Sequence, residues 1–288
     1  MLGKLMKHEW RGVCKVGLLM LLLIAVVTFF GWLAFQTPMW QSLASDNSYN
    51  GEVSPLDIMS FVTLFMYIIM LIGISYGILI YLGVHFYRTM YTEEGYLTHT
   101  LPVSKWKLLN SKVLVGSIWC LIVSIAVWAS VVVLAFSLIG AVTPDMPWGE
   151  IWRDLVDNWA QIRGEIADAF GVEVSRWFIL SVISLLVQPI CSVVILFGAI
   201  SMGQLFTKHR VLMAIVMYVV ILIISMMIGS AIQSITSMNV ITDMLAGAGT
   251  MGTYMDTTTI SSLIQNTIIA AILYLTSYLV IDKKLNME

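Results

Sequence analysis

The chain has 288 residues, of which 59% are hydrophobic and only 11% are charged. Its mean hydropathy is +0.90. Soluble domains carry about 25% charged residues, so this composition excludes an ordinary water-soluble protein and predicts one that resides in a bilayer. The net charge of −2 is close to neutral, and only its distribution along the chain is informative.

Long apolar runs recur along the chain. A helix that crosses about 30 Å of hydrocarbon at 1.5 Å per residue needs about 20 apolar residues. Runs of this kind lie at about 13–35, 58–84, 113–142, 177–206, 211–232 and 262–281. They lack the alternating period of barrel strands. The sequence therefore predicts an all-α, polytopic membrane protein of about six transmembrane helices, organised as a single transmembrane domain over residues 1–288.

The first dozen residues combine an apolar flank with a basic one. Leu5, Met6 and Trp10 recur at helical spacing, whereas Lys4 and Lys7 belong to the other flank. Such a pattern is typical of a helix that lies in the membrane interface. Residues 1–12 are therefore interpreted either as a separate amphipathic elbow helix or as the charged start of the first span.

Basic residues are distributed unequally between the two sides of the predicted spans. Twelve of the 15 lie on the side of the termini, and they are Lys4, Lys7, Arg11, Lys15, Arg88, Lys105, Lys107, Lys112, Lys208, Arg210, Lys283 and Lys284. Positive charge is retained in the cytoplasm. We therefore expect a multi-pass protein of the cell (inner) membrane with both termini cytoplasmic.

Two of the segments predicted to lie outside differ in character. Tryptophans recur through the charged segment 148–170, at Trp148, Trp152 and Trp159, which predicts one amphipathic helix. That helix suits the membrane interface, a groove on a partner subunit, or a lid on the protein's own helix ends. Residues 234–261 are rich in Thr, Met and Gly and are expected to form a loop with a glycine turn, not a nucleotide site, since no strand precedes them.

The predicted spans contain no central Asp, Glu, Lys or Arg. Intramembrane catalysis and ion coupling need ionisable groups at depth, so neither is expected, and no metal or catalytic constellation is found. The polar pair Gln188-Pro189 predicts a kink or break in the fourth span, because proline cannot donate the helix hydrogen bond. This site is interpreted either as a pore or hinge element or as an architectural kink.

The most informative polar segment is 85–112, between the second and third spans. It contains an acidic-aromatic turn at Glu93, Glu94, Gly95, Tyr96 and Leu97, followed by Leu101-Pro102. A short helix here with exposed Tyr96 and Leu97 would fit a groove on a partner. The alternative is a solvated connector whose charges only set the topology.

At these residues the chain resembles the permease subunits of ABC-2 type ATP-binding cassette transporters. The resemblance lies in Phe86-Tyr87-Arg88, in Glu93-Glu94-Gly95-Tyr96-Leu97 and in Leu101-Pro102-Val103-Ser104-Lys105, together with an elbow that precedes six spans. It implies that Glu93 to Pro102 form a coupling helix that docks on an ATPase. The larger amphipathic segment 148–170 departs from much of that family.

The resemblance also implies the partners and the energy source. The chain has no P-loop, so ATP and Mg²⁺ would be bound by a separate P-loop ATPase dimer, and this chain would not itself be an enzyme. A second permease subunit, identical or different, and membrane lipids are the other expected partners, and no nucleic acid is expected. The substrate would be a hydrophobic or amphipathic peptide, lipid or drug, exported through a dimeric pore. A membrane scaffold or sensor that recruits cytoplasmic partners is the alternative.

Overall fold

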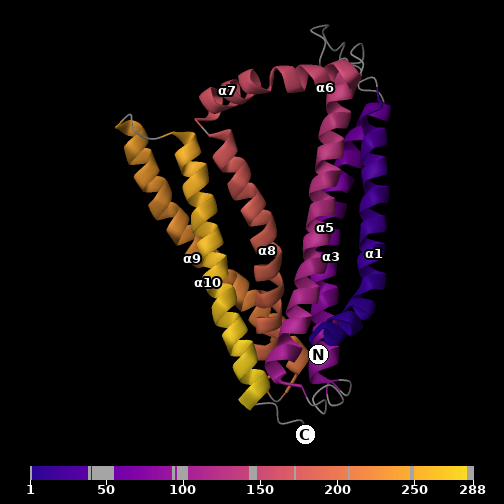
Figure 1. The fold of residues 1–288 in the computed structure, drawn as a ribbon, viewed down its shortest axis with the longest axis vertical. Coiled ribbons are helices and arrows are strands. Elements are labelled where there is room, and N and C mark those ends of the chain that lie inside the picture. The colour runs from indigo at the N-terminus through magenta and orange to yellow at the C-terminus, as the bar shows by residue number, and fades with distance from the viewer. Residues whose placement is uncertain are drawn as a thin grey trace. The chain divides into compact units, whose positions relative to one another are not determined.

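The computed structural model describes residues 2–37, 40, 55–92, 95, 103–142, 148–171, 173–206, 208–246 and 250–283. All the regular elements in these ranges are helices, which confirms the all-α fold (Figure 1). The elements are α1 (Leu2–Ala34), α3 (Pro55–Tyr91), α5 (Lys105–Val142), α6 (Trp148–Asp157), α7 (Trp159–Phe170), α8 (Val174–Gly203), α9 (Arg210–Leu245) and α10 (Met251–Lys283).

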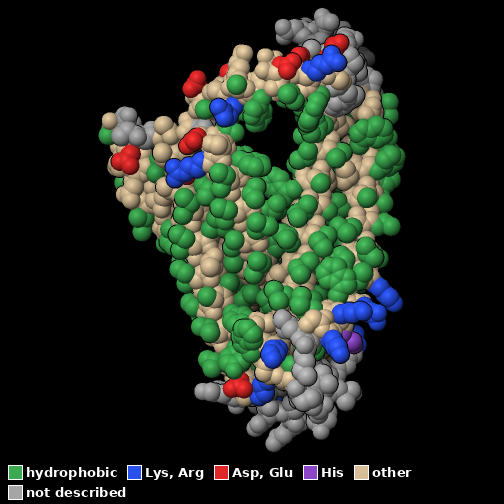
Figure 2. Space-filling view, in the orientation of Figure 1, with side chains coloured by type: hydrophobic (Ala, Val, Ile, Leu, Met, Phe, Trp, Pro, Cys, Tyr) green, Lys and Arg blue, Asp and Glu red, His purple; other side chains and the backbone are tan. Residues whose placement is uncertain are grey.

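Six of these helices, α1, α3, α5, α8, α9 and α10, are long and apolar enough to cross a membrane. Each coincides with one predicted span, and most extend beyond it at one or both ends. Apolar side chains cover the lengths of these helices, and charged side chains gather near helix ends (Figure 2). The prediction of six spanning helices is therefore confirmed, and the chain has the character of a multi-pass membrane protein.

The chain divides into two compact units. Unit 1 comprises Met1–Cys14, Leu79–Leu121 and Arg163–Glu288, and unit 2 comprises Lys15–Ile78 and Ile122–Ile162. Helices α1, α3 and α5 each contribute one segment to both units, whereas α8, α9 and α10 belong to unit 1 alone.

Unit 2 packs through small and hydroxyl side chains. Ser130 of α5 lies 2.6 Å from Thr28 of α1 and 2.7 Å from the hydroxyl of Tyr67 in α3. Gly31 of α1 has no side chain to separate it from Leu134 and Tyr67, whose atoms lie about 3 Å from where a Cβ would stand. Three helices thus meet around Ser130 in the manner of small-residue packing in membranes.

Unit 1 is built around α8, which packs on α9 and α10. On another flank, the ring of Phe197 in α8 stacks on Phe86 of α3 at 4.0 Å between centroids, with an angle of 6° between planes. Glycines allow the closest approaches, because a Cβ on Gly203 would overlap the backbone of Ala214 and one on Gly198 would lie 2.7 Å from Leu273. Unit 1 therefore holds segments of all six long helices.

The predicted loop over residues 234–261 is mostly helical. Helix α9 continues to Leu245 and α10 begins at Met251, so both helices extend well beyond the predicted spans at 211–232 and 262–281. Hydroxyl side chains bond back to carbonyls of the preceding turn, for example Thr257 Oγ1 to the Thr253 oxygen at 2.7 Å. Such bonds keep Ser and Thr compatible with a helix even where their number suggests a loop. Gly247 and Gly249 lie outside the described residues.

The amphipathic segment 148–170 is helical, but it forms two helices, α6 and α7, with an interruption at Asn158. Hydrogen bonds continue on both sides, from the Asn158 N–H to the Asp154 oxygen and from the Ile162 N–H to the Asn158 oxygen, each at 2.9 Å. Trp152 is 61% exposed and Trp159 is 52% exposed, whereas Ile151 is buried. The side chain of Trp148 lies outside the described set.

Candidate functional site: an ionic cluster in unit 1

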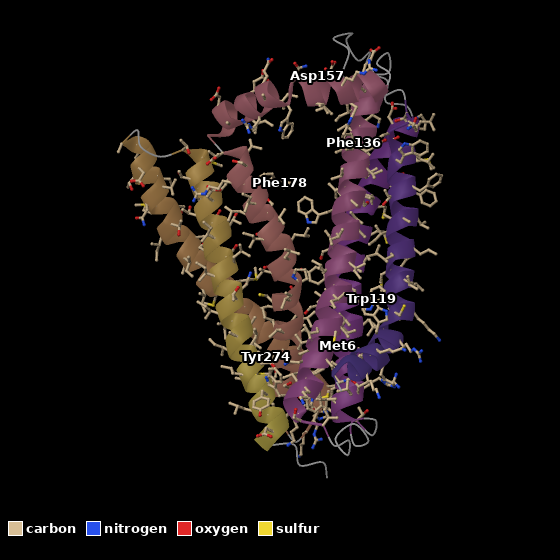
Figure 3. All side chains as sticks on the ribbon, in the orientation of Figure 1. Met6, Trp119, Phe136, Asp157, Phe178 and Tyr274 are labelled. Atoms are coloured by element: carbon tan, nitrogen blue, oxygen red, sulfur yellow. The ribbon has the colours of Figure 1, made fainter. Side chains whose placement is uncertain are left out.

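The start of α1 is continuous with the first span. Helix α1 runs from Leu2 to Ala34 as one element, and both interpretations of residues 1–12, as an elbow or as the charged start of the span, stay predictions. Leu5 and Met6 are half-buried and Val13 is buried, while Lys4 and Lys7 are exposed. Met6 and Tyr274 of α10 lie toward the same end of unit 1 (Figure 3). The apolar flank of the first dozen residues thus packs inward.

An acidic residue lies on that buried flank and makes an ionic cluster with α3 and α5. Glu9 Oε1 accepts a bond from Lys112 Nζ at 2.5 Å, and its Oε2 lies 3.0 Å from His85 Nε2. Lys112 Nζ also donates to the hydroxyl of Thr89 at 2.7 Å. The side chain of Lys112 is only 2% exposed and that of Glu9 is 12% exposed. A charge buried to this degree requires a partner, and here each charged group has one.

Aromatic contacts surround this cluster. The indole rings of Trp10 in α1 and Trp119 in α5 lie 4.9 Å apart between centroids, at 33°. The Tyr81 hydroxyl of α3 donates to the Gly12 oxygen at 3.0 Å, and a Cβ on Gly12 would lie 3.1 Å from the His85 ring. The first three turns of α1 are therefore held on α3 and α5 by ionic, hydrogen-bond and ring contacts together.

The helix ends that flank the predicted coupling segment are also held by α8 and α10. The hydroxyl of Tyr91, the last residue of α3, donates to the Ser201 hydroxyl of α8 at 2.8 Å. At the start of α5, Lys105 Nζ donates to the Asp282 carbonyl of α10 at 3.0 Å, and Asn110 Oδ1 accepts from Tyr274 at 2.6 Å. Both ends of the segment 92–104 are thus fixed to other helices of unit 1.

The coupling residues themselves are mostly beyond the described part of the chain. Glu93, Glu94, Tyr96, Leu97, Leu101 and Pro102 lie outside the described residues, and their roles stay predictions. Gly95 is described and buried, and its N–H donates to the Thr92 oxygen at 2.8 Å. A Cβ on Gly95 would lie 2.5 Å from the Met90 oxygen, so only glycine fits this close approach to the end of α3.

The pair Gln188-Pro189 lies inside α8, which continues through it from Val174 to Gly203. The helix is therefore not broken at this pair, and the expected kink stays a prediction. Asn266 of α10 donates through Nδ2 to Gln188 Oε1 at 3.3 Å. The preceding residue of α10, Gln265, donates to the Ser225 oxygen of α9 at 2.7 Å. Neighbouring amides of α10 therefore bond to α8 and α9, and whether Pro189 acts as a hinge stays a prediction.

Sequence reasoning missed the ionic cluster, although the sequence carries a signal for it. Glu9 is the only acidic residue among the first 45, and it shares the helix face of Leu5 and Val13 at four-residue spacing. An acid on an apolar face next to a span requires a cationic partner on a neighbouring helix. Lys112 was counted only as a charge that sets the topology.

Among the described residues, no group of three His, Cys, Asp or Glu side chains is placed to hold a metal ion. The ionic cluster consists of a lysine, a carboxylate, an imidazole and a hydroxyl, and its contacts join α1, α3 and α5. Comparisons of the chain with protein-family models, with curated proteins and with solved structures give no match.

Proposed function

We propose that this chain is the membrane-spanning permease subunit of an ABC-2 type transporter that exports a hydrophobic or amphipathic molecule. A separate P-loop ATPase dimer supplies the energy by docking on the segment 92–104, and a second permease subunit completes the pore. The chain lies in the cell (inner) membrane with both termini in the cytoplasm. The motif resemblance around Glu93 to Pro102 and the six long apolar helices support this proposal.

One observation carries the proposal furthest. The segment 92–104 connects two helix ends that are themselves bonded to α8 through Tyr91 and to α10 through Lys105. Seven residues beyond Lys105, Lys112 is bonded to Glu9 of α1. A displacement of the helix ends on either side of this segment by a docked ATPase would therefore reach α8, α10 and α1 through these three contacts, and mechanical coupling requires such connections.

The test is co-purification of a P-loop ATPase with the tagged full-length chain and measurement of ATP hydrolysis in reconstituted membranes. Alanine at both Tyr96 and Leu97 should abolish ATPase retention, because anchors at an interface contribute roughly 2 kcal/mol or more each. Lys107→Ala is the matched control: Lys107 is exposed on α5 and should have little effect. Wild-type retention and hydrolysis in the double variant would favour a membrane scaffold that recruits other cytoplasmic partners.

The proposed topology has its own test. A cysteine introduced at Asp154, in α6, is expected to react with a membrane-impermeant maleimide in intact cells, because the distribution of basic residues places α6 outside. A cysteine at Lys107 is expected to react only after permeabilisation. Labelling of both sites from the same side would contradict the six-span topology.

A further inference from the structure

We propose that unit 1 contains a binding site for an anionic phospholipid, formed by an apolar groove between α3, α8 and α9 with basic residues at its end. The groove has a volume of about 540 Å³, within the range of small-molecule sites. It is lined by Ile80, Gly83, Val84 and Tyr87 of α3, by Leu196 and Ile200 of α8, and by Val211, Ala214, Ile215 and Tyr218 of α9.

The groove follows from the spacing of these residues. The lining positions of α3 and of α9 each recur at three- and four-residue intervals over eight residues, so each helix presents one continuous face over roughly 10 Å. Ile200 and Ala214 are buried and form the floor, and Gly83 leaves room between them and α3. The walls are open, since Ile80 is 65% exposed and Ile215 is 61% exposed.

The chemistry of the walls selects an acyl chain. The lining residues are apolar except for the two tyrosine hydroxyls, and they belong to helices long and apolar enough to span a membrane. Such a groove excludes polar substrates, whereas an extended hydrocarbon chain can pack along its apolar side chains by van der Waals contact. A linear groove of this length, open to the side, suits one acyl chain better than a compact ring system.

The chemistry of the groove's end selects the headgroup. Val211 lines the groove, Arg210 directly precedes it, and Lys208 lies two residues earlier; both basic side chains are exposed. The groove therefore begins at the point where α9 enters the apolar region and where two positive charges are found. Anionic headgroups gain about 1 kcal/mol from each Lys or Arg near the surface, and the cytoplasmic leaflet, to which these residues are assigned, is the one that carries such lipids.

The inference does not depend on an ATPase partner, because it is tested on the purified full-length chain alone. After delipidation, the chain is titrated with phosphatidylglycerol or phosphatidylcholine bearing two oleoyl chains, and bound lipid is counted by native mass spectrometry. Phosphatidylglycerol is expected to bind more tightly than phosphatidylcholine, whose headgroup has no net charge.

Two pairs of variants separate the chain site from the headgroup site. Ile215→Trp, which places an indole in the groove, should lower the amount of phosphatidylglycerol bound, because the ring occupies space that the acyl chain needs. Ile223→Trp is its control, since Ile223 is also on α9 and 51% exposed but does not line the groove. Exchange of both Lys208 and Arg210 for Gln should weaken binding roughly thirtyfold, whereas the same exchange at the exposed Lys4 and Lys7 should not.

Three results would overturn the proposal. The first is equal affinity of the Ile215→Trp and Ile223→Trp variants for phosphatidylglycerol. The second is equal binding of the charged and the neutral lipid, or an equal loss from both Gln pairs. The third is a dimer of the chain that Ile215→Trp dissociates without any change in lipid affinity, which would assign the groove to a second copy.

Discussion

Two of the sets of polar contacts between helices of unit 1 differ in kind. The ionic cluster of Glu9, His85, Thr89 and Lys112 carries full charges, with a lysine that is almost fully buried. The amide contacts of α10, from Asn266 to Gln188 and from Gln265 to Ser225, are neutral. Both join three helices.

The difference between the two sets lies in what remains when one member is removed. When a neutral amide loses its partner, the unfolding free energy falls by about the value of one hydrogen bond. When a buried charge loses its partner, the unfolding free energy falls by several times more. Helix starts and ends bring enough complementary groups together to hold a buried charge. Helix interiors, far from those ends, use neutral amides.

The largest effect is expected for Lys112→Ala. Loss of the ammonium leaves the Glu9 carboxylate on the buried flank of α1 with only the ring of His85 as its partner in the ionic cluster. Breaking a buried pair in this way costs about 3 to 5 kcal/mol of unfolding free energy. The measurement is unfolding of the purified chain in mixed micelles, followed by far-ultraviolet circular dichroism.

Lys107→Ala is the control for that experiment. Lys107 belongs to the same helix and is exposed, so its loss should change the unfolding free energy by only about 0 to 1 kcal/mol. Similar losses from Lys107→Ala and Lys112→Ala would mean that the Glu9–Lys112 pair does not stabilise the start of α1.

A double-mutant cycle sharpens the same contrast. Glu9→Gln alone leaves the Lys112 ammonium buried without a carboxylate, and Lys112→Met alone leaves the carboxylate. The combined variant removes both charges and keeps the volume of both side chains, so it should be more stable than the less stable single variant by about 1 to 3 kcal/mol. Strictly additive losses in unfolding experiments would show that the two residues act independently.

The sequence was sufficient to predict the six long helices, because composition and run length are local properties. In a bilayer, a long apolar run must satisfy its own backbone hydrogen bonds and therefore forms a helix. It was insufficient at helix ends. The hydroxyl-rich residues near Thr257 look like a loop, yet their side chains bond back to the preceding turn and extend α10. The periodicity of residues 148–170 predicts one helix, whereas the structure has two, divided at Asn158. Periodicity shows which face of a helix is apolar, but it does not show where the helix ends.

The candidate site was harder to predict for a different reason. Along the chain, Glu9 is separated from His85 by 76 positions and from Lys112 by 103 positions. Their contact depends on how three helices pack, which no local pattern contains. What the sequence did contain was an acid on an apolar face, and this identifies one partner without identifying the other.

Pro189→Ala tests the middle of α8. Alanine restores an N–H that can donate to the carbonyl four residues earlier, so the unfolding free energy should change by less than about 1 kcal/mol. If the proline permits a movement of α8, stimulation of the partner ATPase should nevertheless fall in reconstituted membranes. Unchanged stimulation and transport would reduce Pro189 to an architectural role.

The smallest effect is expected for Asn266→Leu, which removes the amide contact of α10 with Gln188. The bond is 3.3 Å long and exposed, and interhelical side-chain bonds in membranes average about 0.6 kcal/mol. Leucine also gains favourable contact with lipid, so the net change in unfolding free energy should be within about 0.5 kcal/mol of zero, measured in the same micelles as the Lys112 variants. Gln265→Leu is the companion variant: it removes the shorter bond to the Ser225 oxygen, at 2.7 Å, and should cost more than Asn266→Leu. A loss of several kcal/mol from either variant would place these amides with the ionic cluster, and the distinction between charged helix ends and neutral helix interiors would no longer describe how unit 1 is held together.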